Sequence, residues 1–407
     1  MMYTLMNADY EVLQFEAGRT YNDIRFIKAL EGINAAPIYF DKRAPGADLA
    51  NFISTRVIST GRNDAKDILS ALGMESPLEL SLRAYGLSLT DCYWYRPQGC
   101  TLKWKDVSCF GRKWDTRFGE AILSKDYDLL KKADPLTPDC TLGGITTKAW
   151  LHQNGTPVML KAENCEDAFI TRAELLSAQL AKRLLDEKDR VDYRQEQFAG
   201  RRFIACDCMI SDNEEFVPAQ QLISLLGWKN GYDTFKQISK DNELLKEFTN
   251  KAVSLGVSGT AAYFAKIAIV FNLSLGGDSH FMNFGFIRDL DTLKLRTAPL
   301  FDRGRSFGSF GEPIENGCIS VKKYALTTPK TLFLIMLLFS TICRPEWDYS
   351  WFEPKRLEGF TQEIADTLSG CEEATDEFIK LLQQAFEYQL DYVCKAAEKS
   401  RCVPRTD

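Results

Sequence analysis

Residues 146–163, TTKAWLHQNGTPVMLKAE, contain an Asn-Gly dipeptide between two runs of alternating apolar residues. Asn-Gly readily adopts the left-handed backbone of a two-residue hairpin turn, so the segment predicts two antiparallel strands joined at Asn154 and Gly155. Residues 167–187 carry apolar side chains at three- and four-residue spacing, which predicts an amphipathic helix. A further strand is expected over 201–210. This hairpin–helix–strand order constrains the fold more than any other part of the chain.

The segments on either side of this region differ in character. The N-terminal part mixes strand, turn and short-helix signals, and the prolines of KKADPLTPDC (131–140) mark a boundary. The C-terminal part has helical patterns, with a long apolar helix expected over 259–277 and an amphipathic helix over 374–399. The expected parts are an α/β subdomain (1–135), a small sheet-containing lobe (136–222) and a larger, mostly helical lobe (223–407). A small sheet lobe followed by a helical lobe is the layout of a bilobal kinase.

Composition excludes some classes of protein. The 407 residues are 45% apolar and 26% charged, with a net charge of −6, which is ordinary for a globular protein and disfavours one that itself wraps DNA. The twelve cysteines form no CxxC pair and there are only two histidines, so a zinc site is disfavoured and reduced thiols in the cytoplasm are expected. The most apolar stretch, residues 331–343, is shorter than the about 20 residues that span a bilayer. We expect it to be a buried helix, with no membrane contact.

Several residues of the sheet-containing part match what phosphoryl transfer from ATP requires, which includes a loop over the phosphates and a lysine that holds them. Gly143 and Gly144, in TLGGITTK, would let backbone N–H groups approach an anion closely, and Lys148 ends this stretch. Lys161 comes off the second, otherwise apolar hairpin strand. Glu174 lies near the start of the following helix, where it is placed to orient Lys161.

A second group of polar residues interrupts the mostly apolar segment FNLSLGGDSHFMNFGF (271–286). Asp278, His280 and Asn283 follow the expected apolar helix, and a short loop there would point Asp278 and Asn283 inward. Asp302, after the strand-like APLF, supplies a second carboxylate, and Mg²⁺ prefers one or two carboxylates plus phosphate oxygens.

Each feature alone has an ordinary structural explanation. Adjacent glycines often form a plain turn, and a strand lysine often points into solvent. A histidine such as His280 often hydrogen-bonds only backbone, and Asp278 and Asp302 would each suit a turn cap. The order of glycine loop, lysine, glutamate, aspartate–asparagine and aspartate, across a sheet and then helices, favours the kinase interpretation.

These motifs resemble those of the HipA-like serine/threonine kinases of bacteria. GGDSHFMNFGF resembles their D-x-H-x-x-N catalytic loop, and APLFDRGRSF resembles their metal-binding aspartate segment. TLGGITTK resembles their glycine-rich loop, and SLRAYGLSLTDCYWYRP (81–97) is similar to an element of a subgroup associated with Gram-positive bacteria. The resemblance touches residues 80–310. It implies an α+β, bilobal protein-kinase-like fold, with a smaller sheet-containing lobe and a larger helical lobe.

The resemblance also implies roles in the helical part. Asp278 would be the catalytic base, and His280 would shape the loop around it. Asn283 and Asp302 would hold Mg²⁺.

In the sheet-containing part, Lys161 would contact the ATP phosphates and pair with Glu174. The backbone from Cys206 to Met209 would form the hinge for adenine. Thr141, seven positions before Lys148, would be the candidate for autophosphorylation.

The expected function is therefore that of an ATP- and Mg²⁺-dependent serine/threonine protein kinase acting on a protein substrate. It would be the toxin of a toxin–antitoxin pair, with a DNA-binding antitoxin as its partner and no direct contact with nucleic acid. Two alternatives stay open. One is a catalytically silent, kinase-like regulatory module, and the other is a small-molecule or lipid kinase with the same two lobes.

Overall fold

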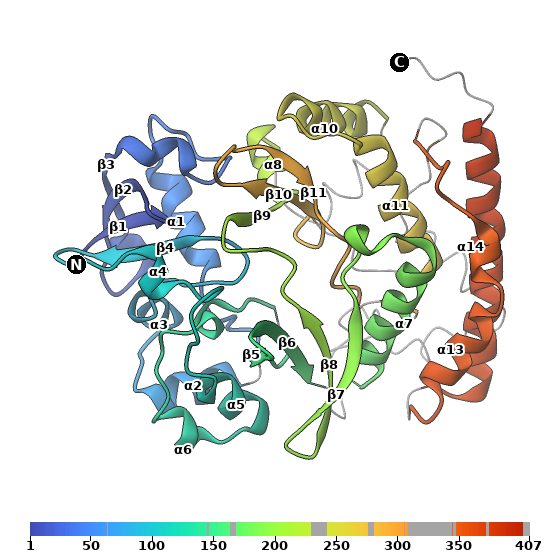
Figure 1. Cartoon of the computed structure of the whole chain (residues 1–407), viewed down its shortest axis with the longest axis horizontal. Coiled ribbons are helices and arrows are strands. Elements are labelled where there is room, and N and C mark those ends of the chain that lie inside the picture. The colour runs from blue at the N-terminus through green and yellow to red at the C-terminus, as the bar shows by residue number, and fades with distance from the viewer. Residues whose placement is uncertain are drawn as a thin grey trace. The chain divides into compact units, whose positions relative to one another are not determined.

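Figure 1 shows the chain as a computed structural model. The residues that the structure describes are 1–62, 64–144, 146–162, 168–228, 242–275, 281–304, 306–307, 344, 347–371 and 374–401. The chain forms two compact units. The first unit comprises Met1–Ala162, Gln195–Val217 and Ile287–Lys294, and the second unit comprises Glu163–Arg194, Pro218–Phe286 and Leu295–Asp407. These units interleave along the chain, so they do not test the three consecutive parts expected from the sequence, which stay a prediction.

The N-terminal sheet of the first unit has the strand order β3-β2-β1-β4, and all neighbouring strands are antiparallel. Its strands are β1 (Met2–Asn7), β2 (Tyr10–Glu16), β3 (Arg25–Ala29) and β4 (Tyr93–Pro97). Buried Phe15 and Tyr95 pack in one apolar cluster with residues of α1 (Gly46–Thr55) and α3 (Pro77–Arg83). The first three of these strands were not predicted from the sequence.

A second sheet has the order β5-β6-β8-β7. Its strands are β5 (Lys148–Gln153), β6 (Thr156–Ala162), β8 (Arg201–Asp207) and β7 (Tyr193–Phe198). The hairpin expected at Asn154 and Gly155 is confirmed, since β5 and β6 pair antiparallel and the two turn residues have φ values of 51° and 85°. The strand expected over 201–210 is confirmed as β8.

Short helices cover part of this sheet. They are α2 (Ala65–Leu72), α5 (Arg117–Ser124) and α6 (Tyr127–Leu130). Helix α4 (Trp104–Val107) belongs to a different apolar cluster of the unit. Phe118 and Ile122 of α5 share a buried apolar cluster with Leu151 of β5 and Phe203 of β8. Helix α5 lies so close to β5 that a Cβ atom on Gly119 would be 2.7 Å from the backbone oxygen of Trp150. Glycine at this position therefore sets how closely helix and strand approach.

Three further strands form a small sheet of order β11-β10-β9. They are β9 (Glu214–Pro218), β10 (Gly285–Asp289) and β11 (Leu295–Thr297). Within the first unit, buried Glu215 accepts hydrogen bonds from Arg288 at 2.7 Å and from Asn7 at 3.1 Å. Burial raises the pKa of Glu215, and the Arg288 charge opposes that rise. The ion pair joins β1, β9 and β10 through side chains.

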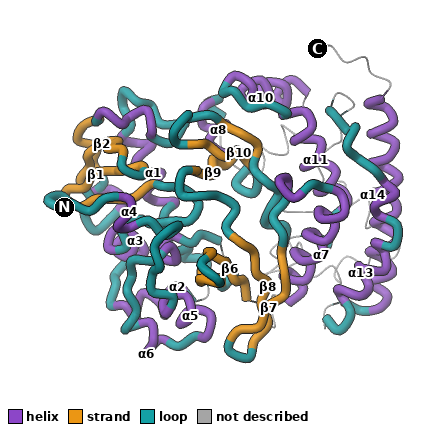
Figure 2. The backbone as a smooth tube through the Cα atoms, viewed as in Figure 1, coloured by secondary structure: helices purple, strands orange, loops and turns teal. Residues whose placement is uncertain are grey.

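The second unit is mostly helical, and Figure 2 shows its helices in purple. They are α7 (Ala168–Leu184), α8 (Gln220–Leu225), α10 (Asn242–Ser254), α11 (Thr260–Leu273), α13 (Phe360–Leu368) and α14 (Asp376–Arg401). Helix α7 packs on α11 and α13, and α14 packs on the same two helices. An ion pair between Arg183 of α7 and Glu363 of α13 reinforces this packing.

The long helices agree with the sequence patterns. Helices α7, α11 and α14 confirm those expected over 167–187, 259–277 and 374–399. The Thr375 hydroxyl accepts a hydrogen bond from the Phe378 N–H at 3.2 Å, as an N-cap does. The helix expected over 331–343 lies outside the described residues. None of the helices in the described part of the chain is long and apolar enough to cross a membrane.

The eight cysteines within the described residues are free thiols. Burial raises the pKa of Cys109 to about 12 and that of Cys208 to about 11. Because the thiolate is the reactive form, the raised pKa disfavours reaction of either thiol near neutral pH.

Candidate functional site

The glycine-rich loop lies between the short 3₁₀ helix η3 (Pro138–Thr141) and strand β5. Gly143 and Gly144 are exposed, and Gly144 has a φ of 81°, which disfavours any side chain. A Cβ atom built on Gly144 would lie 2.8 Å from Nζ of Lys148. The loop therefore presents open backbone next to a lysine ammonium group.

Two lysines face each other across the hairpin. Lys148 is the register partner of Lys161 in the β5–β6 pair, so both side chains project from the same face. Lys161 is only 6% exposed and Lys148 is half-buried. Lys161 is thus not an ordinary solvated strand lysine. Like charges at directly opposed positions repel, and a nearby anion relieves that repulsion.

A buried carboxylate, Asp139, fixes the start of the loop. It is fully buried and accepts hydrogen bonds from the Trp150 N–H and from the Thr137 hydroxyl, both at 2.7 Å. Burial raises the pKa of Asp139 to about 6, although the two hydrogen bonds and the Arg62 charge act in the opposite direction. Asp139 ties η3 to β5, and so holds together the two elements that flank the loop. No motif marks Asp139, so its position beside the loop was not predicted from the sequence.

The end of the loop contacts a second buried pair. Arg62 and Asp64 form an ion pair with a 2.8 Å distance between Nε and Oδ1. An Arg62 N–H donates to the Lys148 carbonyl at 3.4 Å, and the Thr147 hydroxyl lies 3.5 Å from the Asp64 carboxylate. The N-terminal residues that the sequence analysis left without a role therefore reach the glycine-rich loop.

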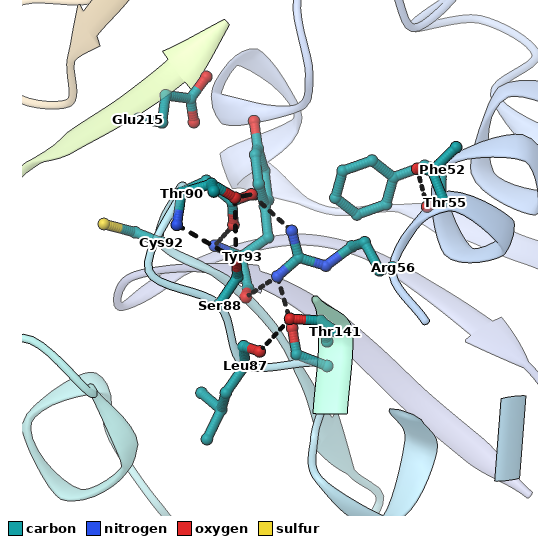
Figure 3. Close-up of polar contacts among 12 residues, drawn as sticks. Phe52, Thr55, Arg56, Leu87, Ser88, Thr90, Cys92, Tyr93, Thr141 and Glu215 are labelled. Atoms are coloured by element: carbon teal, nitrogen blue, oxygen red, sulfur yellow. Dashed lines mark hydrogen bonds and ion pairs between the residues drawn. The ribbon is translucent and has the colours of Figure 1, made fainter. Parts of the chain in front are cut away.

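Thr141, the candidate for autophosphorylation, is buried in η3. Its hydroxyl donates to the Leu87 carbonyl at 2.7 Å and lies 3.2 Å from the Pro138 carbonyl, as Figure 3 shows for Leu87. In this conformation the hydroxyl is bound to backbone and is covered by protein.

The expected hinge residues lie on β8 and just after it, in the same sheet as β5 and β6. Cys206 lies on β8 opposite Met159 of β6, and Met209 is half-buried just beyond the strand. The Cys208 N–H donates to the Pro157 carbonyl at 3.0 Å, which extends the pairing past the end of β8. The segment from Cys206 to Met209 thus belongs to the same unit as Lys161.

In the second unit, Asn283 lies between two buried phenylalanines. Phe281 and Phe284 accept backbone hydrogen bonds from Gln220 at 3.0 Å and from Ala219 at 2.9 Å. These bonds join the segment to the start of α8, and Asn283 itself is buried. Asp278 and His280, expected as the catalytic base and its neighbour, lie outside the described residues.

The segment that follows Asp302 lies close to Glu174 in the second unit. The Asp302 N–H donates to the Tyr193 hydroxyl at 3.1 Å, and its φ of 50° is unusual for a residue other than glycine. A Cβ atom on Gly304 would lie 2.9 Å from Ile170 and 3.4 Å from Oε2 of Glu174. The tight fit of Gly304 against α7 therefore brings the segment after Asp302 beside the buried Glu174 carboxylate.

The structure thus sorts the expected site residues into two groups. Those in the first unit are Thr141, Gly143, Gly144, Lys148, Lys161, Cys206 and Met209. Those in the second unit are Glu174, Asn283 and Asp302. The implied pairing of Lys161 with Glu174 joins residues of different units and stays a prediction.

Comparison with known proteins agrees with the expected fold. No model of a protein family and no curated protein sequence matches the chain. HipA of Shewanella oneidensis MR-1, solved with HipB and operator DNA, is similar over 99% of this chain and 100% of its own, with a TM-score of 0.51 and 12% identity. The proinflammatory kinase CtkA of Helicobacter pylori is similar over 64% of this chain and 93% of its own, with a TM-score of 0.44 and 14% identity. The HipA likeness confirms the fold class, a kinase-like α+β fold.

Proposed function

We propose that the chain is an ATP- and Mg²⁺-dependent serine/threonine protein kinase of the HipA-like family, in the subgroup that residues 81–97 resemble. The observation that carries the proposal is the pairing of Lys148 with Lys161 on one hairpin face, next to the exposed glycines. Two cations beside open backbone N–H groups form a strong anion site, and a polyphosphate supplies the matching charge. The HipA-like fold makes a nucleotide the best candidate for that anion.

The donor chemistry in the second unit suits Mg²⁺. Asp302 offers a half-buried carboxylate and Asn283 a buried amide oxygen, and Mg²⁺ takes few protein oxygens when phosphates supply others. When bound, the ion neutralises charge on the phosphates. Asn283 and Asp302 would hold it.

The chain's own groups would then carry out the transfer. Asp278 accepts the proton of a serine or threonine hydroxyl while that oxygen bonds to the γ-phosphorus of ATP. The bond from the γ-phosphorus to the bridging oxygen breaks, and ADP leaves with the electron pair. Lys161 and Lys148 would stabilise the negative charge on the phosphates through their positively charged ammonium groups.

Thr141 would become a phosphate acceptor only after η3 leaves its present position. Its hydroxyl is covered and donates to the Leu87 carbonyl, so no ATP phosphorus can approach it here. A phosphate would add close to two negative charges beside backbone carbonyls. Phosphorylation would therefore favour the displaced loop and switch the site off.

A protein partner is part of the proposal. The HipA structure that shares this fold contains HipB and operator DNA. This chain has a net charge of −6, which does not favour DNA contact of its own. We therefore expect a DNA-binding antitoxin as its partner in the cytoplasm.

Intact-mass measurement after incubation with ATP and Mg²⁺ tests the proposal. We expect the wild-type chain to gain phosphate on itself or on an added protein substrate, and Asp278→Ala to give at least a hundredfold less. Peptide mapping then shows whether Thr141 carries the phosphate. A chain that shows neither transfer nor a rise in melting temperature with ATP–Mg²⁺ would refute the proposal. A rise in melting temperature without transfer to any substrate would indicate the silent regulatory module.

A further inference from the structure

Within the described residues, the guanidinium group of one buried arginine of the second unit, Arg303, makes no hydrogen bond or ion pair. Arg303 is 7% exposed and stacks on Phe271 of α11, with 4.0 Å between its guanidinium carbon and the ring centroid. Its Nε, Nη1 and Nη2 atoms are all buried, and none has a hydrogen-bond partner among the described residues. The adjacent Asp302 acts on Arg303 through its charge but makes no hydrogen bond with the guanidinium group. A buried charge without hydrogen bonds is strongly unfavourable, so the position suits a further anion.

Other buried arginines of the chain show how it normally meets this need. Each of three holds a carboxylate on its guanidinium group. The pairs and their distances are Arg56–Asp91 at 2.5 Å, Arg62–Asp64 at 2.8 Å and Arg288–Glu215 at 2.7 Å.

Arg56 is the closest parallel to Arg303, because it also stacks on a phenylalanine. Figure 3 shows its guanidinium group beside the Phe52 ring, at 5.1 Å from the centroid. In addition to Asp91, Arg56 donates to the carbonyls of Gly86 and Tyr93. Arg303 keeps the aromatic contact and lacks this set of acceptors within the described part of the chain.

The described residues around Arg303 offer few acceptors for its guanidinium group. The Tyr263 hydroxyl already donates to the Gly285 carbonyl at 2.8 Å and accepts the Gly285 N–H at 3.1 Å. The Arg303 backbone is held in place, because its carbonyl accepts from the Ser306 hydroxyl at 2.7 Å. The neighbouring Asp302 is half-buried, so this segment reaches solvent one residue away.

We propose that Arg303 anchors a phosphate or phosphate-ester oxyanion. A guanidinium group presents five N–H donors in a rigid fork, and three unpartnered nitrogens suit an anion with three or four oxygens better than a two-oxygen carboxylate. The source of the phosphate, a nucleotide or a phosphorylated product, is inferred from the proposed function. The need of Arg303 for an anion is not.

The first test compares two arginine-to-methionine variants without ligand. Methionine fills a similar apolar space and removes the charge, so Arg303→Met is expected to keep or raise the melting temperature. The matched control, Arg56→Met, strands the buried Asp91 carboxylate and is expected to lower it. If Arg303→Met lowers the melting temperature as Arg56→Met does, or fails to fold, Arg303 has a structural partner within the chain and the inference is wrong.

The second test adds anions at constant ionic strength. Pyrophosphate, inorganic phosphate and ATP are each titrated by calorimetry into wild type, Arg303→Met and Arg303→Lys. Sodium acetate is the carboxylate control. We expect pyrophosphate to bind wild type and to bind Arg303→Met about ten- to a hundredfold more weakly, with Arg303→Lys between them. Equal affinities for wild type and Arg303→Met, or a response to acetate alone, would overturn the inference.

The two proposals fail separately. Pyrophosphate binding that depends on Arg303, in a chain that transfers no phosphate from ATP, would support the anion site and refute the kinase. Phosphate transfer from ATP, together with an unchanged pyrophosphate affinity in Arg303→Met, would support the kinase and refute the anion site.

Discussion

The properties of two single residues, Asp139 and Arg303, depend on their burial. Asp139 stands in no motif, and Arg303 lies in the APLFDRGRSF segment without being one of the residues that the motif marks. Yet Asp139 is a fully buried carboxylate, and Arg303 is a buried guanidinium group without a hydrogen bond to the described residues. Sequence alone shows neither property, because the same residues on a surface would be unremarkable. Lys161 and Asp302 were predicted as site residues from the order of glycine loop, lysine and aspartates along the chain, and their roles stay a prediction.

Asp139 predicts a specific pH dependence of stability. Its pKa is raised from 3.8 to about 6 in the folded protein, so the folded state binds this proton more tightly than the unfolded chain does. The resulting stabilisation is complete below pH 3.8 and is lost as the pH rises through about 6. It amounts to about 3 kcal/mol in the free energy of unfolding.

Urea unfolding of wild type and Asp139→Asn, at several pH values between 4 and 7, measures this contribution. The amide cannot ionise, so the wild type is expected to lose stability relative to the variant over this range. Parallel pH profiles for the two proteins would show that Asp139 ionises in the folded state as it does in water.

At the level of elements, strong local signals predicted the structure well. The hairpin at Asn154 and Gly155 and the helices α7, α11 and α14 are confirmed, because turn chemistry and helical periodicity act within short stretches. Strands β1 and β2 were missed. Their connection places Ala8 at a φ of 47°, where a glycine or asparagine would have marked a turn. Tertiary packing, not local preference, holds that residue there.

Helix α5 gives a prediction in which packing outweighs helix propensity. Alanine normally favours a helix over glycine by about 1 kcal/mol. At Gly119, however, a Cβ atom would meet the Trp150 oxygen at 2.7 Å, so Gly119→Ala is expected to destabilise the fold by about 1–3 kcal/mol.

Gly46, the first residue of α1, is the control. A Cβ atom there would make an ordinary 3.5 Å contact with Phe26, so Gly46→Ala is expected to be neutral or slightly stabilising. Thermal unfolding of both variants gives the comparison. A Gly119→Ala protein as stable as Gly46→Ala would mean that α5 moves away from β5 at little cost.

At the scale of the whole molecule, the sequence predicted a kinase-like α+β fold, and the HipA likeness confirms it. At 12% identity the two chains share a fold but little sequence. The fold class was therefore predicted from the order of short motifs, because overall sequence similarity is too low to indicate it. What the sequence could not supply is the interleaving of the two compact units along the chain, because that depends on contacts between residues far apart in sequence.

The net charge of −6 predicts weak contact with DNA by the chain alone. Because non-specific DNA binding comes mainly from positive charge that neutralises phosphates, we expect no binding of duplex DNA at physiological salt. Fluorescence anisotropy with a labelled duplex, at low and physiological salt, measures this. Salt-dependent binding in the micromolar range by the chain without a partner would contradict the prediction and reveal a local basic surface.

The hairpin between β5 and β6 also has a practical consequence. Its tip residue Gly155 is open to solvent on the side where a side chain would project, while the register pair Lys148 and Lys161 lies at the opposite end of the hairpin. Exposed loop tips tolerate insertions well. A small peptide tag or fluorophore-binding sequence placed between Asn154 and Gly155 would therefore label the chain at an internal site, and could be used to search for a DNA-binding partner.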